Sequence, residues 1–443
     1  MSVLLQTMEA KTRVLILGAG FAGLECCKSL SDQLFEVTLI DRQNHHLFQP
    51  LLYQVATASL TAPDIAKPVR EILAGQPNVT VLMDEVERID LTKQLIVSHA
   101  QSYVFDYLVI ALGAKTGYFG KPEWEQHAHG LKSLEDAREL RHRVLQSLER
   151  AELINDIEEK RKLLSIVIVG GGPTGVELAG AFTELIHRTL KDGFRKVAPS
   201  DLNVTLIEAA PRLLGTFDAD QSEYAQRRLE RLGIAVRTGT MVNEVYANRV
   251  VLENETLEAA TIIWAAGTEA NPVTAAMPVE KDRYGRLIVG PDCALANYPN
   301  VFAIGDIANC TDKHSVKVPT LAAAAAQMGK HVGKLIRDEV RVKQSHKKSN
   351  AALLRRQFRY FDKGNMAIIG KSSAVLKANK LKMRGFLAWL AWLFVHLLLL
   401  VGFRNKLAVL LQWGFAYLRG RRSARIIVRP DQIENARLHN REH

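Results

Sequence analysis

The sequence predicts an α/β fold made of two similar units, in which helices cover a parallel sheet, and two glycine motifs carry this prediction. The first motif, G-A-G-F-A-G at residues 18–23, directly follows the aliphatic run Val14–Leu17. The second, G-G-G-P-T-G at residues 170–175, follows the run Ile166–Val169. Both runs are typical of buried parallel strands, and both motifs lead into a helix-like segment. In this context the pattern is a dinucleotide-binding fingerprint, so we expect two Rossmann-like domains and two dinucleotides.

An acidic residue follows each fingerprint at the end of a further predicted strand. Asp41 and Glu208 each end a β-branched and aliphatic run. A carboxylate at this position binds a free ribose 2′-hydroxyl and repels a 2′-phosphate, so we expect the second domain to prefer NADH to NADPH. Glu208 lies further from its fingerprint than the usual spacing of about 20 residues, and we attribute this to an insertion at residues 192–201. Arg212 is close by and leaves the strictness of the preference open.

Three more predicted strands end in glycine turns, at Gly113, Gly267 and the pair Gly305-Asp306. The first of these strands is expected from Tyr103 onward. A plain turn at the end of a strand would explain Gly305-Asp306 equally well. Between the two fingerprints, residues 133–162 carry Arg, Glu and Leu at helical spacing, which predicts helices leading into the second domain.

The composition is that of a globular protein with room for two or three domains. The chain has 443 residues, of which 47% are hydrophobic. None of its four cysteines forms a C-x-x-C pair, so we expect a reducing compartment and no disulfide framework. Residues 1–11 lack the basic and apolar regions of a secretory signal. We expect no bound metal, since the chain has no calcium-loop pattern.

The net charge of +11 arises in one region near the C-terminus. Residues 363–430 contain no Asp or Glu but carry thirteen Lys and Arg residues. Within this region, residues 385–403 have no charged side chain, include Trp389 and Trp392, and are flanked by basic residues. Basic residues and tryptophans beside an apolar segment are typical of contact with an anionic membrane. A leucine-rich helix does not bind bases, so we expect no nucleic-acid partner.

Two kinds of membrane contact fit the segment 385–418. Residues 385–403 are long enough to span the bilayer with little tilt, as a transmembrane helix. Alternatively, the helix lies in the membrane interface beside a second helix at residues 407–418, which is apolar on one face. A buried core helix or a homodimer contact is the remaining explanation of the apolar run.

With these motifs assembled, the chain resembles the two-dinucleotide flavoprotein reductases, and within them the type II NADH dehydrogenases. Three local sequences carry the narrower resemblance: H-H-L-F-Q-P-L-L-Y-Q-V-A at residues 45–56, G-V-E-L-A at 175–179, and V-P-T-L-A-A-A-A-A-Q at 318–327. The last resembles a quinone-site pattern A-Q-x-A-x-Q, in which Ala323 replaces the first glutamine. Related disulfide and sulfide:quinone reductases need cysteines just after Asp41 or in the middle of the chain, and this chain has none there.

The resemblance implies a site for each cofactor and two residues near the chemistry. FAD would bind the first fingerprint and NADH the second. Glu177 would lie near the nicotinamide and the flavin, where it holds the nicotinamide amide or routes protons, and Gln327 would lie on the quinone side. Both also have ordinary explanations as helix residues, as do His45 and His46, which could relay protons. The expected cofactor-binding residues are Gly18, Gly20, Phe21, Gly23, Asp41, Gly113, Gly305 and Asp306 for FAD, and Gly170, Gly172, Thr174, Gly175, Glu208, Ala266 and Gly267 for NADH.

The expected function is therefore hydride transfer from NADH to FAD and electron transfer to a membrane quinone, without proton pumping. The alternatives are a soluble reductase of a ferredoxin-like acceptor and a non-enzymatic redox sensor. The basic residues around the apolar segment indicate a location on the cytoplasmic side of the cell inner membrane, and a homodimer stays open. The expected domains are an FAD domain in two parts at residues 12–125 and 281–345, an NADH domain at 160–280, and a C-terminal region at 350–443 with its membrane helices at 385–418.

Overall fold

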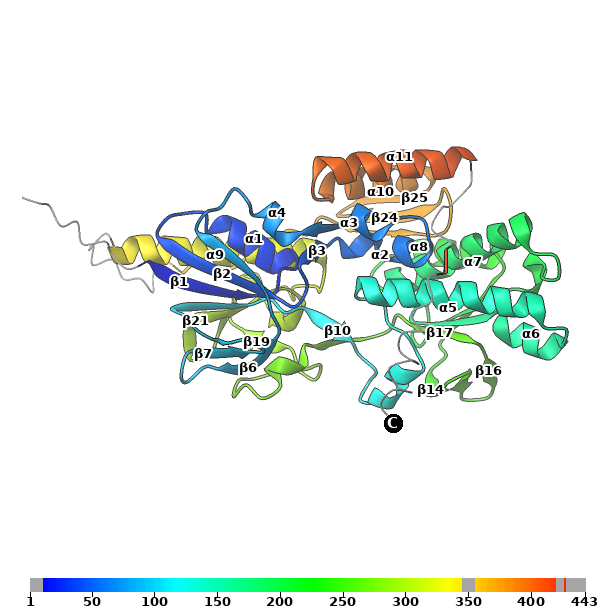
Figure 1. Ribbon diagram of the computed structural model, residues 1–443, viewed down its shortest axis with the longest axis horizontal. Helices are drawn as coiled ribbons and strands as arrows, with labels where there is room; N and C mark the ends of the chain where they lie inside the picture. Colours follow the sequence, from blue (N-terminus) through cyan, green and yellow to red (C-terminus); the bar gives the residue numbers. More distant parts are fainter. Residues whose placement is uncertain (1–10, 345–354, 420–425, 428–443) are drawn as a thin grey trace, which may run out of the picture. The chain divides into compact units, whose positions relative to one another are not determined.

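The computed structural model describes residues 11–344, 355–419 and 426–427. The contacts of the chain divide it into two compact units. Unit 1 is built from residues 1–47, 66–115 and 268–363, and unit 2 from residues 48–65, 116–267 and 364–443. Figure 1 labels many of the elements of both units. Each unit contains a parallel sheet with helices packed on it, so the predicted α/β class is confirmed.

The sheet of unit 1 has eight strands in the order β22-β19-β20-β21-β9-β1-β2-β5. Its strands β21, β9, β1, β2 and β5 are all parallel, and the aliphatic residues of β9 and of the second half of β1 are buried on both faces. In chain order the strands are β1 (Thr12–Leu17), β2 (Phe35–Asp41), β5 (Val79–Met83), β9 (Tyr107–Ile110), β19 (Leu287–Val289), β20 (Ala294–Leu295), β21 (Tyr298–Ala303) and β22 (Ala308–Cys310).

Two helices of unit 1, α1 (Phe21–Ser29) and α9 (Ala322–Gln344), lie side by side (Figure 1). Glycines make this close packing possible. A Cβ on Gly329 would lie 2.0 Å from the carbonyl oxygen of Ala22, and one on Gly333 would lie 2.7 Å from that of Cys26. Since no side chain fits there, the backbone of α9 lies against that of α1 and holds the first fingerprint helix in place.

The remaining elements of unit 1 are short. The predicted strand from Tyr103 is wrong in one respect, because it is broken before Asp106, whose carboxylate binds the backbone and guanidinium of Arg13. Its first part belongs to a separate antiparallel sheet, and only its second part is β9.

The short elements are β3 (His45–Leu47), β4 (Ala66–Pro68), α4 (Val69–Ile72), β6 (Val86–Asp90), β7 (Leu95–Ser98), β8 (Ser102–Val104), β10 (Ala114–Thr116), β18 (Thr268–Ala270), η4 (Pro272–Thr274) and η5 (Gly305–Ile307).

Unit 2 repeats the arrangement with a four-stranded parallel sheet in the order β13-β12-β11-β17. These strands are β11 (Ser165–Val169), β12 (Asn203–Glu208), β13 (Ile234–Thr238) and β17 (Thr261–Trp264). A three-stranded antiparallel sheet follows β13 and consists of β14 (Val242–Tyr246), β15 (Arg249–Leu252) and β16 (Thr256–Glu258).

Three helices of unit 2 begin at residues that favour helix starts. Ser133 and Asp136 form a capping box at α5, Asp156 caps α6, and Pro173 occupies the first turn of α7. The helical spacing at residues 133–162 is thus confirmed as two helices. The helices are η1 (Gln49–Leu51), α2 (Leu52–Ala56), α3 (Ala62–Ile65), η2 (Pro122–Gln126), α5 (Leu134–Leu153), α6 (Ile157–Leu163), α7 (Pro173–Gly193), η3 (Pro199–Asp201) and α8 (Ala219–Arg231).

The C-terminal part of unit 2 begins with an antiparallel sheet of three strands, β23 (Asn365–Ile368), β24 (Ala374–Ala378) and β25 (Leu381–Gly385). Two helices follow, α10 (Phe386–Leu399) and α11 (Phe403–Arg419). The sheet packs against α7 and α8, and α10 packs against β24 and β25.

Candidate functional site

The first fingerprint forms a tight turn between β1 and α1, and the protein itself requires two of its three glycines. Gly18 has a φ of +101°, and a Cβ there would lie 2.4 Å from the carbonyl oxygen of Ala111. A Cβ on Gly23 would lie 1.8 Å from the carbonyl oxygen of Gly18. Gly20 differs, because its φ is an ordinary −67° and no atom lies within 4 Å of a Cβ built there. The space over Gly20 is open, as a bound pyrophosphate needs it to be.

Asp41 ends β2 directly beside this turn. Its carboxylate accepts hydrogen bonds from the backbone N–H of Ala19, at 2.6 Å, and of Gln43, at 2.7 Å. Burial raises the pKa of Asp41, and the two backbone hydrogen bonds oppose that rise. The carboxylate is therefore fixed at the edge of the turn, where a ribose would lie next to the pyrophosphate.

The other expected FAD residues of unit 1 lie at the same edge of the sheet. Gly113 follows β9 with a φ of +68°, and Gly305 follows β21 with a φ of +76°. Because β1, β2, β9 and β21 are parallel neighbours, their carboxyl ends meet along one edge. Asp306, in η5, is half-buried there, and a Cβ on Gly305 would lie 3.2 Å from the side chain of Ala22 in α1. The structure thus gathers these residues around one cradle.

His46 contacts the turn of the first fingerprint on both sides of Gly20, and the sequence did not predict this role. Its Nδ1 lies 2.9 Å from the carbonyl oxygen of Ala19, and its ring meets that of Phe21 edge-on, with centroids 4.9 Å apart. Since a carbonyl only accepts, Nδ1 carries the proton of a neutral ring, and burial lowers the pKa of His46. These contacts fix the residues on both sides of Gly20.

The second fingerprint has the same geometry within unit 2. Gly170 has a φ of +111°, and a Cβ there would lie 2.7 Å from the carbonyl carbon of Ala265. A Cβ on Gly175 would lie 1.8 Å from the carbonyl oxygen of Gly170. Gly172 again has open space around it and an ordinary φ of −72°. Thr174 is exposed at the start of α7, where backbone N–H groups are free to meet a phosphate.

Glu208 lies beside this turn as Asp41 lies beside the first. Its carboxylate accepts hydrogen bonds from the backbone N–H of Gly171, at 2.5 Å, and of Ala210, at 2.7 Å. The long spacing to the fingerprint is taken up by the 21-residue helix α7 and the loop with η3 that follows it. The extra residues therefore do not displace the carboxylate. Gly267, with a φ of +72°, follows Ala266 and β17 at the same edge of the sheet.

Glu177 is buried on the inner face of α7, two residues after the last fingerprint glycine. Its Oε1 accepts a hydrogen bond of 3.3 Å from the backbone N–H of Ile368 in β23. Burial raises the pKa of Glu177 to about 8, and the one backbone hydrogen bond only partly offsets it. The carboxyl group is therefore mostly protonated at neutral pH, and it can donate a proton as well as accept a hydrogen bond.

The same face of α7 holds the turn after β23. A Cβ on Gly180 would lie 2.7 Å from the backbone nitrogen of Gly370, and Glu184 accepts a hydrogen bond from the backbone N–H of Lys371. Glu177, Gly180 and Glu184 are three and four residues apart, so they form one stripe along the helix. The helix of the second fingerprint is thereby joined to the sheet that carries α10.

The raised pKa of Glu177 predicts how stability depends on pH. Its ordinary pKa is 4.5, so between about pH 4.5 and about pH 8 the folded protein binds more protons at this site than the unfolded chain. The free energy of unfolding should therefore fall as the pH rises through this window. Glu177→Gln keeps the shape of the neutral acid and removes this part of the dependence. Urea unfolding should show the variant gaining stability relative to the parent as the pH rises, and parallel curves would contradict the raised pKa.

Both ends of the Gln327 side-chain amide form hydrogen bonds with one backbone residue. Its Nε2 donates to the carbonyl oxygen of Phe361, and its Oε1 accepts from the N–H of the same residue, both at 3.0 Å. The side chain thus holds the segment around Phe361, near the end of unit 1, against α9. Its expected place on the quinone side of the flavin stays a prediction, and Ala323 lies one turn earlier on the same helix.

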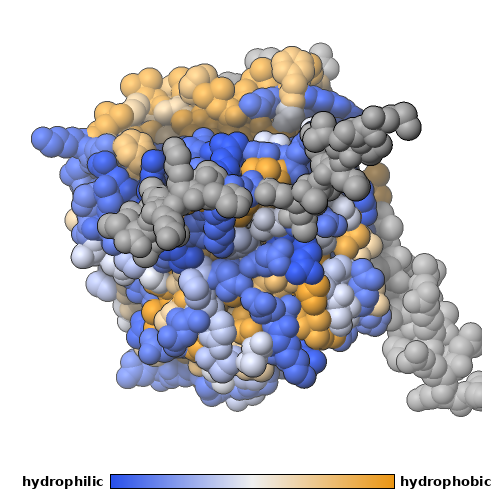
Figure 2. Space-filling model, turned by 90° about the vertical axis from the view of Figure 1, so that its left-hand side faces the viewer, coloured by the Kyte–Doolittle hydropathy of each residue, from blue (hydrophilic) through white to orange (hydrophobic). Residues whose placement is uncertain are grey.

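The helices α10 and α11 expose an unusually large set of apolar side chains. They gather in one hydrophobic band (Figure 2). We define the apolar face by its exposed members, which are Phe386, Leu387, Leu390, Phe394, Leu398, Leu399, Phe403, Leu407, Leu410, Leu411 and Phe415. Patches of this kind mark a surface that contacts a membrane or another apolar partner.

The opposite faces of α10 and α11 pack against α2 and α3 and form hydrogen bonds with them. Trp392 is buried and lies edge-on to Tyr53, with ring centroids 6.5 Å apart. The indole N–H of Trp413 donates to Gln54 at 2.8 Å. Gln412 donates to the buried carboxylate of Asp64 at 3.0 Å. The apolar face is therefore one side of a fixed helix pair.

The structure corrects one prediction about the C-terminal segment. Residues 385–403 do not form one apolar helix, because α10 ends at Leu399 and the chain turns at residues 400–402 before α11. At 1.5 Å per residue, the 14 residues of α10 reach about 21 Å, less than the roughly 30 Å of a bilayer core. Within the described residues, no helix is long and apolar enough to cross a membrane.

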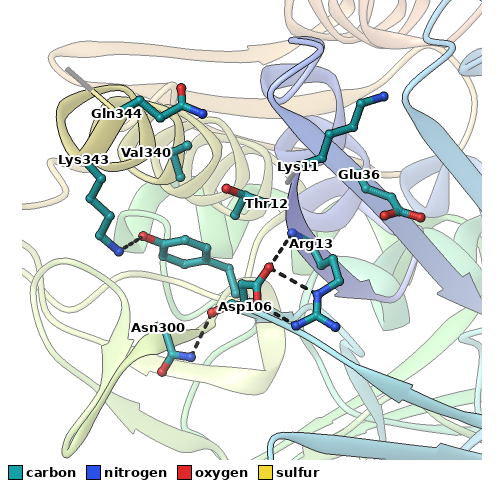
Figure 3. Close-up of a pocket in the computed structure, with 10 residues that line it drawn as sticks. Lys11, Thr12, Arg13, Glu36, Asp106, Asn300, Val340, Lys343 and Gln344 are labelled. Atoms are coloured by element: carbon teal, nitrogen blue, oxygen red, sulfur yellow. Dashed lines mark hydrogen bonds and ion pairs between the residues drawn. The ribbon is translucent and has the colours of Figure 1, made fainter. Parts of the chain in front are cut away.

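A separate pocket of about 840 Å³ lies at the amino ends of the strands in unit 1 (Figure 3). It is bordered by Arg13 and Asp106, which form an ion pair at 2.7 Å, and by Tyr107, whose hydroxyl lies 2.9 Å from Nζ of Lys343. Ligands of parallel α/β sheets bind at the carboxyl ends of the strands. This pocket lies at the opposite ends, away from both Gly20 and Asp41.

Comparison with known protein families gives two matches. The pyridine nucleotide-disulphide oxidoreductase family matches residues 12–329, and the NDH2 C-terminal domain matches residues 363–422. The first match covers the two fingerprints and the Gly305-Asp306 turn. The second covers the sheet and helices that carry the apolar face.

Individual relatives agree with these families. The chain is 40% identical to the type II NADH:quinone oxidoreductase Ndh of Mycobacterium tuberculosis, over 96% of this chain and 92% of the relative. It is 29% identical to the external NADH-ubiquinone oxidoreductase 2 of Saccharomyces cerevisiae mitochondria, over 94% and 82%. Among solved structures, NDH2 from Plasmodium falciparum in complex with NADH has a TM-score of 0.84 at 22% identity, covering 95% of this chain and all of that one. The sulfide:quinone oxidoreductase of Aquifex aeolicus has a TM-score of 0.66 at 17% identity, covering 96% and 95%, and shares the fold.

Proposed function

Because the chain belongs to the pyridine nucleotide-disulphide oxidoreductase family, and within it to the type II NADH:quinone oxidoreductases, we propose specific tasks for its residues in that reaction. The enzyme takes FAD as cofactor, NADH as electron donor and a quinone as acceptor. The observation that carries the assignment of tasks is the pair of cradles at Gly20 and Gly172. Each contains one glycine that no protein contact requires and one carboxylate fixed at its edge.

The residues of unit 1 fit FAD. Gly20 leaves room for the pyrophosphate, and Phe21 begins the helix whose N-terminus faces it. Asp41 binds a ribose hydroxyl, and Gly113, Gly305 and Asp306 line the rest of the cradle. FAD, when bound, supplies the chemistry that accepts a hydride from NADH and passes electrons to the quinone. The task of this unit is to hold the cofactor in one orientation.

The residues of unit 2 hold NADH. Gly172 and Thr174 meet the pyrophosphate at the start of α7, Gly170 and Gly175 shape the turn, and Ala266-Gly267 borders the cradle. Glu208 binds the free 2′-hydroxyl of the adenosine ribose. Its negative charge at this position repels a 2′-phosphate, so NADPH is the poorer donor.

Glu208→Gln should lower this discrimination. The variant keeps an oxygen acceptor for one of the two backbone N–H groups, loses the acceptor for the other, and removes the negative charge that repels a 2′-phosphate. We expect the preference of kcat/KM for NADH over NADPH to fall by about tenfold or more, mostly through KM. Glu253→Gln, at an exposed position on the same unit, is the matched control and should keep the preference. An unchanged preference in the Glu208 variant would remove Glu208 from the nucleotide site.

Glu177 has the second specific task in unit 2. It is neutral and buried just behind the turn that holds NADH, so it can hydrogen-bond the carboxamide of the nicotinamide or pass a proton. Gln327 stays a candidate on the quinone side, and its amide is engaged with Phe361 in the described structure.

The apolar face attaches the enzyme to the membrane where quinones dissolve. Both helices are short, tied to the body on one side and apolar on the other, which is the arrangement of helices lying in the membrane interface. The basic residues of this region favour the cytoplasmic leaflet of the cell inner membrane. Homodimer formation is compatible with this attachment.

The experiment that tests the assignment of Glu177 compares two glutamates of one helix stripe. Glu177→Gln and Glu184→Gln each replace by an amide a carboxyl group that accepts a hydrogen bond from the backbone at or just after the end of β23. We expect NADH oxidation with a short-chain quinone to slow about 100-fold or more in the first variant only, because general acid and base groups contribute on that scale. Equal rates in both variants would leave Glu177 a purely structural residue.

A further inference from the structure

A second, smaller pocket in unit 2 carries an excess of positive charge. It has a volume of about 190 Å³ and lies between α8 and the end of β25. Four arginines border it, Arg227, Arg228 and Arg231 from one face of α8 and Arg384 from β25, together with the ring of Tyr224. The guanidinium of Arg384 lies 5.6 Å from the centre of that ring.

The acidic residues of the pocket do not balance this charge. Glu223 pairs with Arg227. Asp220 lies in the first turn of α8, where the helix dipole favours an acid. Among the described residues, Arg228, Arg231 and Arg384 form no ion pair.

Arg228, which borders this pocket, has a hydrogen-bond donor without a partner in the part of the chain that the structure describes. One of its terminal nitrogens donates to the carbonyl oxygen of Lys371 at 3.2 Å, but its Nε is buried with no partner within the described chain. The helix dipole also favours Arg228 and Arg231 in the last turn of α8. It accounts neither for Arg384, which comes from a different element, nor for the buried Nε.

The pocket lies next to the start of the apolar face. Arg384 precedes Phe386 by two residues and Leu387 by three, and these side chains are 49% and 65% exposed. Since successive Cα atoms are about 3.8 Å apart, the Cα of Arg384 is at most about 7.6 Å from that of Phe386. Gly385, with a φ of +80°, makes the turn against the hydroxyl of Tyr224. A bilayer that receives Phe386 and Leu387 thus brings its headgroups to this pocket.

We propose that this pocket binds the phosphate of an anionic phospholipid headgroup. Guanidinium groups bind phosphate through paired N–H donors, and Arg228 Nε is such a donor without a partner. The volume is below the roughly 300 to 1,000 Å³ of pockets for drug-sized ligands, so it suits one headgroup better than a nucleotide. The proposal rests on the membrane attachment proposed above and adds a discrete lipid site to it.

The test measures binding of the FAD-loaded, full-length protein to two kinds of vesicle. One is pure phosphatidylcholine, and the other contains equal parts of phosphatidylcholine and phosphatidylglycerol. We expect Arg228→Gln with Arg384→Gln to weaken binding to the mixed vesicles about 30-fold, because each arginine near an anionic surface contributes about fivefold. Binding to pure phosphatidylcholine should not change. Arg384→Gln alone, at an exposed position, should weaken binding to the mixed vesicles about fivefold. This single variant serves as the test if the double variant folds poorly.

Two further variants separate a discrete site from diffuse attraction. Arg228→Lys with Arg384→Lys keeps the charge but loses the paired donors, and it should also bind the mixed vesicles more weakly. Arg88→Gln with Arg249→Gln removes the same charge at exposed positions outside the pocket and should have a smaller effect. Binding of the lysine variant at the parent's strength, or an equal loss in the outside variant, would overturn the proposal.

Inorganic phosphate distinguishes a lipid from a soluble ligand. We expect no saturable binding of phosphate to the protein at millimolar concentration, since a free ion lacks the anchoring of a lipid. Saturable phosphate binding that the Arg228 and Arg384 substitutions abolish, with vesicle binding unchanged, would assign the pocket to a soluble phosphate and overturn the lipid assignment. Failure of the membrane attachment itself looks different, since the parent protein would then bind neither kind of vesicle.

Discussion

Gly172→Ala is expected to leave the fold and the FAD content of the enzyme intact while it raises KM for NADH at least about tenfold. Beyond the adjoining residues of the chain, no protein atom lies within 4 Å of the added Cβ, and the φ of −72° suits alanine. Alanine at such a position commonly stabilises a protein by about 0.4 to 1 kcal/mol. Nucleotide binding should nevertheless weaken, because the second fingerprint glycine lets the backbone approach the pyrophosphate. Thermal unfolding and NADH titration of flavin bleaching would measure the two effects.

Gly20→Ala is the matched variant in the other cradle. It also adds a Cβ into open space at a permitted φ, and it should reduce FAD content with NADH binding preserved. Gly175→Ala is the contrasting control, since its Cβ would lie 1.8 Å from the carbonyl oxygen of Gly170 and should destabilise the fold. Normal NADH affinity in Gly172→Ala would show that the second fingerprint does not hold the nucleotide as proposed.

Charging the apolar face should release the enzyme from membranes. Leu387→Glu with Phe394→Glu places two carboxylates among side chains that are 65% and 63% exposed, so the fold loses little packing. Each buried apolar side chain contributes about 1.5 to 3 kcal/mol, and a buried charge costs more than that. Two such changes therefore weaken membrane binding by several orders of magnitude. NADH should still bleach the flavin in the released protein.

The control for this experiment is an even more exposed apolar pair elsewhere in unit 2. Leu153 and Ile157 are each 78% exposed near the ends of α5 and α6. Leu153→Glu with Ile157→Glu adds the same charge outside the apolar face, and this variant should sediment with membranes as the parent does. If the Leu387 and Phe394 variant also sediments fully, the apolar face is not the attachment surface.

The parts of the fold and site that sequence predicts well are those set by local constraints. Gly18 and Gly23 are needed because a Cβ would meet the backbone, and this requirement produces the pattern that identifies each turn. The strands next to these turns are continuous aliphatic runs, which are typical of a buried parallel strand. The position of Glu208 at the end of a strand beside the turn is predictable despite its unusual spacing, because the strand before it keeps its pattern while α7 takes up the extra length.

The parts that sequence did not predict depend on contacts between distant segments. The hydrogen bond from His46 to Ala19, the two bonds between Gln327 and Phe361, and the link from Glu177 to Ile368 join residues far apart in the chain. No local pattern marks them. The break at residues 400–402 was also missed, because the apolar composition continues through a turn that divides α10 from α11.

The central claim is that NADH delivers its electrons to the bound flavin and that a quinone then removes them. Anaerobic stopped-flow absorbance tests both steps in the purified, membrane-bound enzyme. We expect one equivalent of NADH to bleach the flavin, and a short-chain quinone added next to restore its absorbance, each at least as fast as steady-state turnover. Bleaching by NADH without restoration by quinone would contradict the account, since the electrons would then leave by another acceptor.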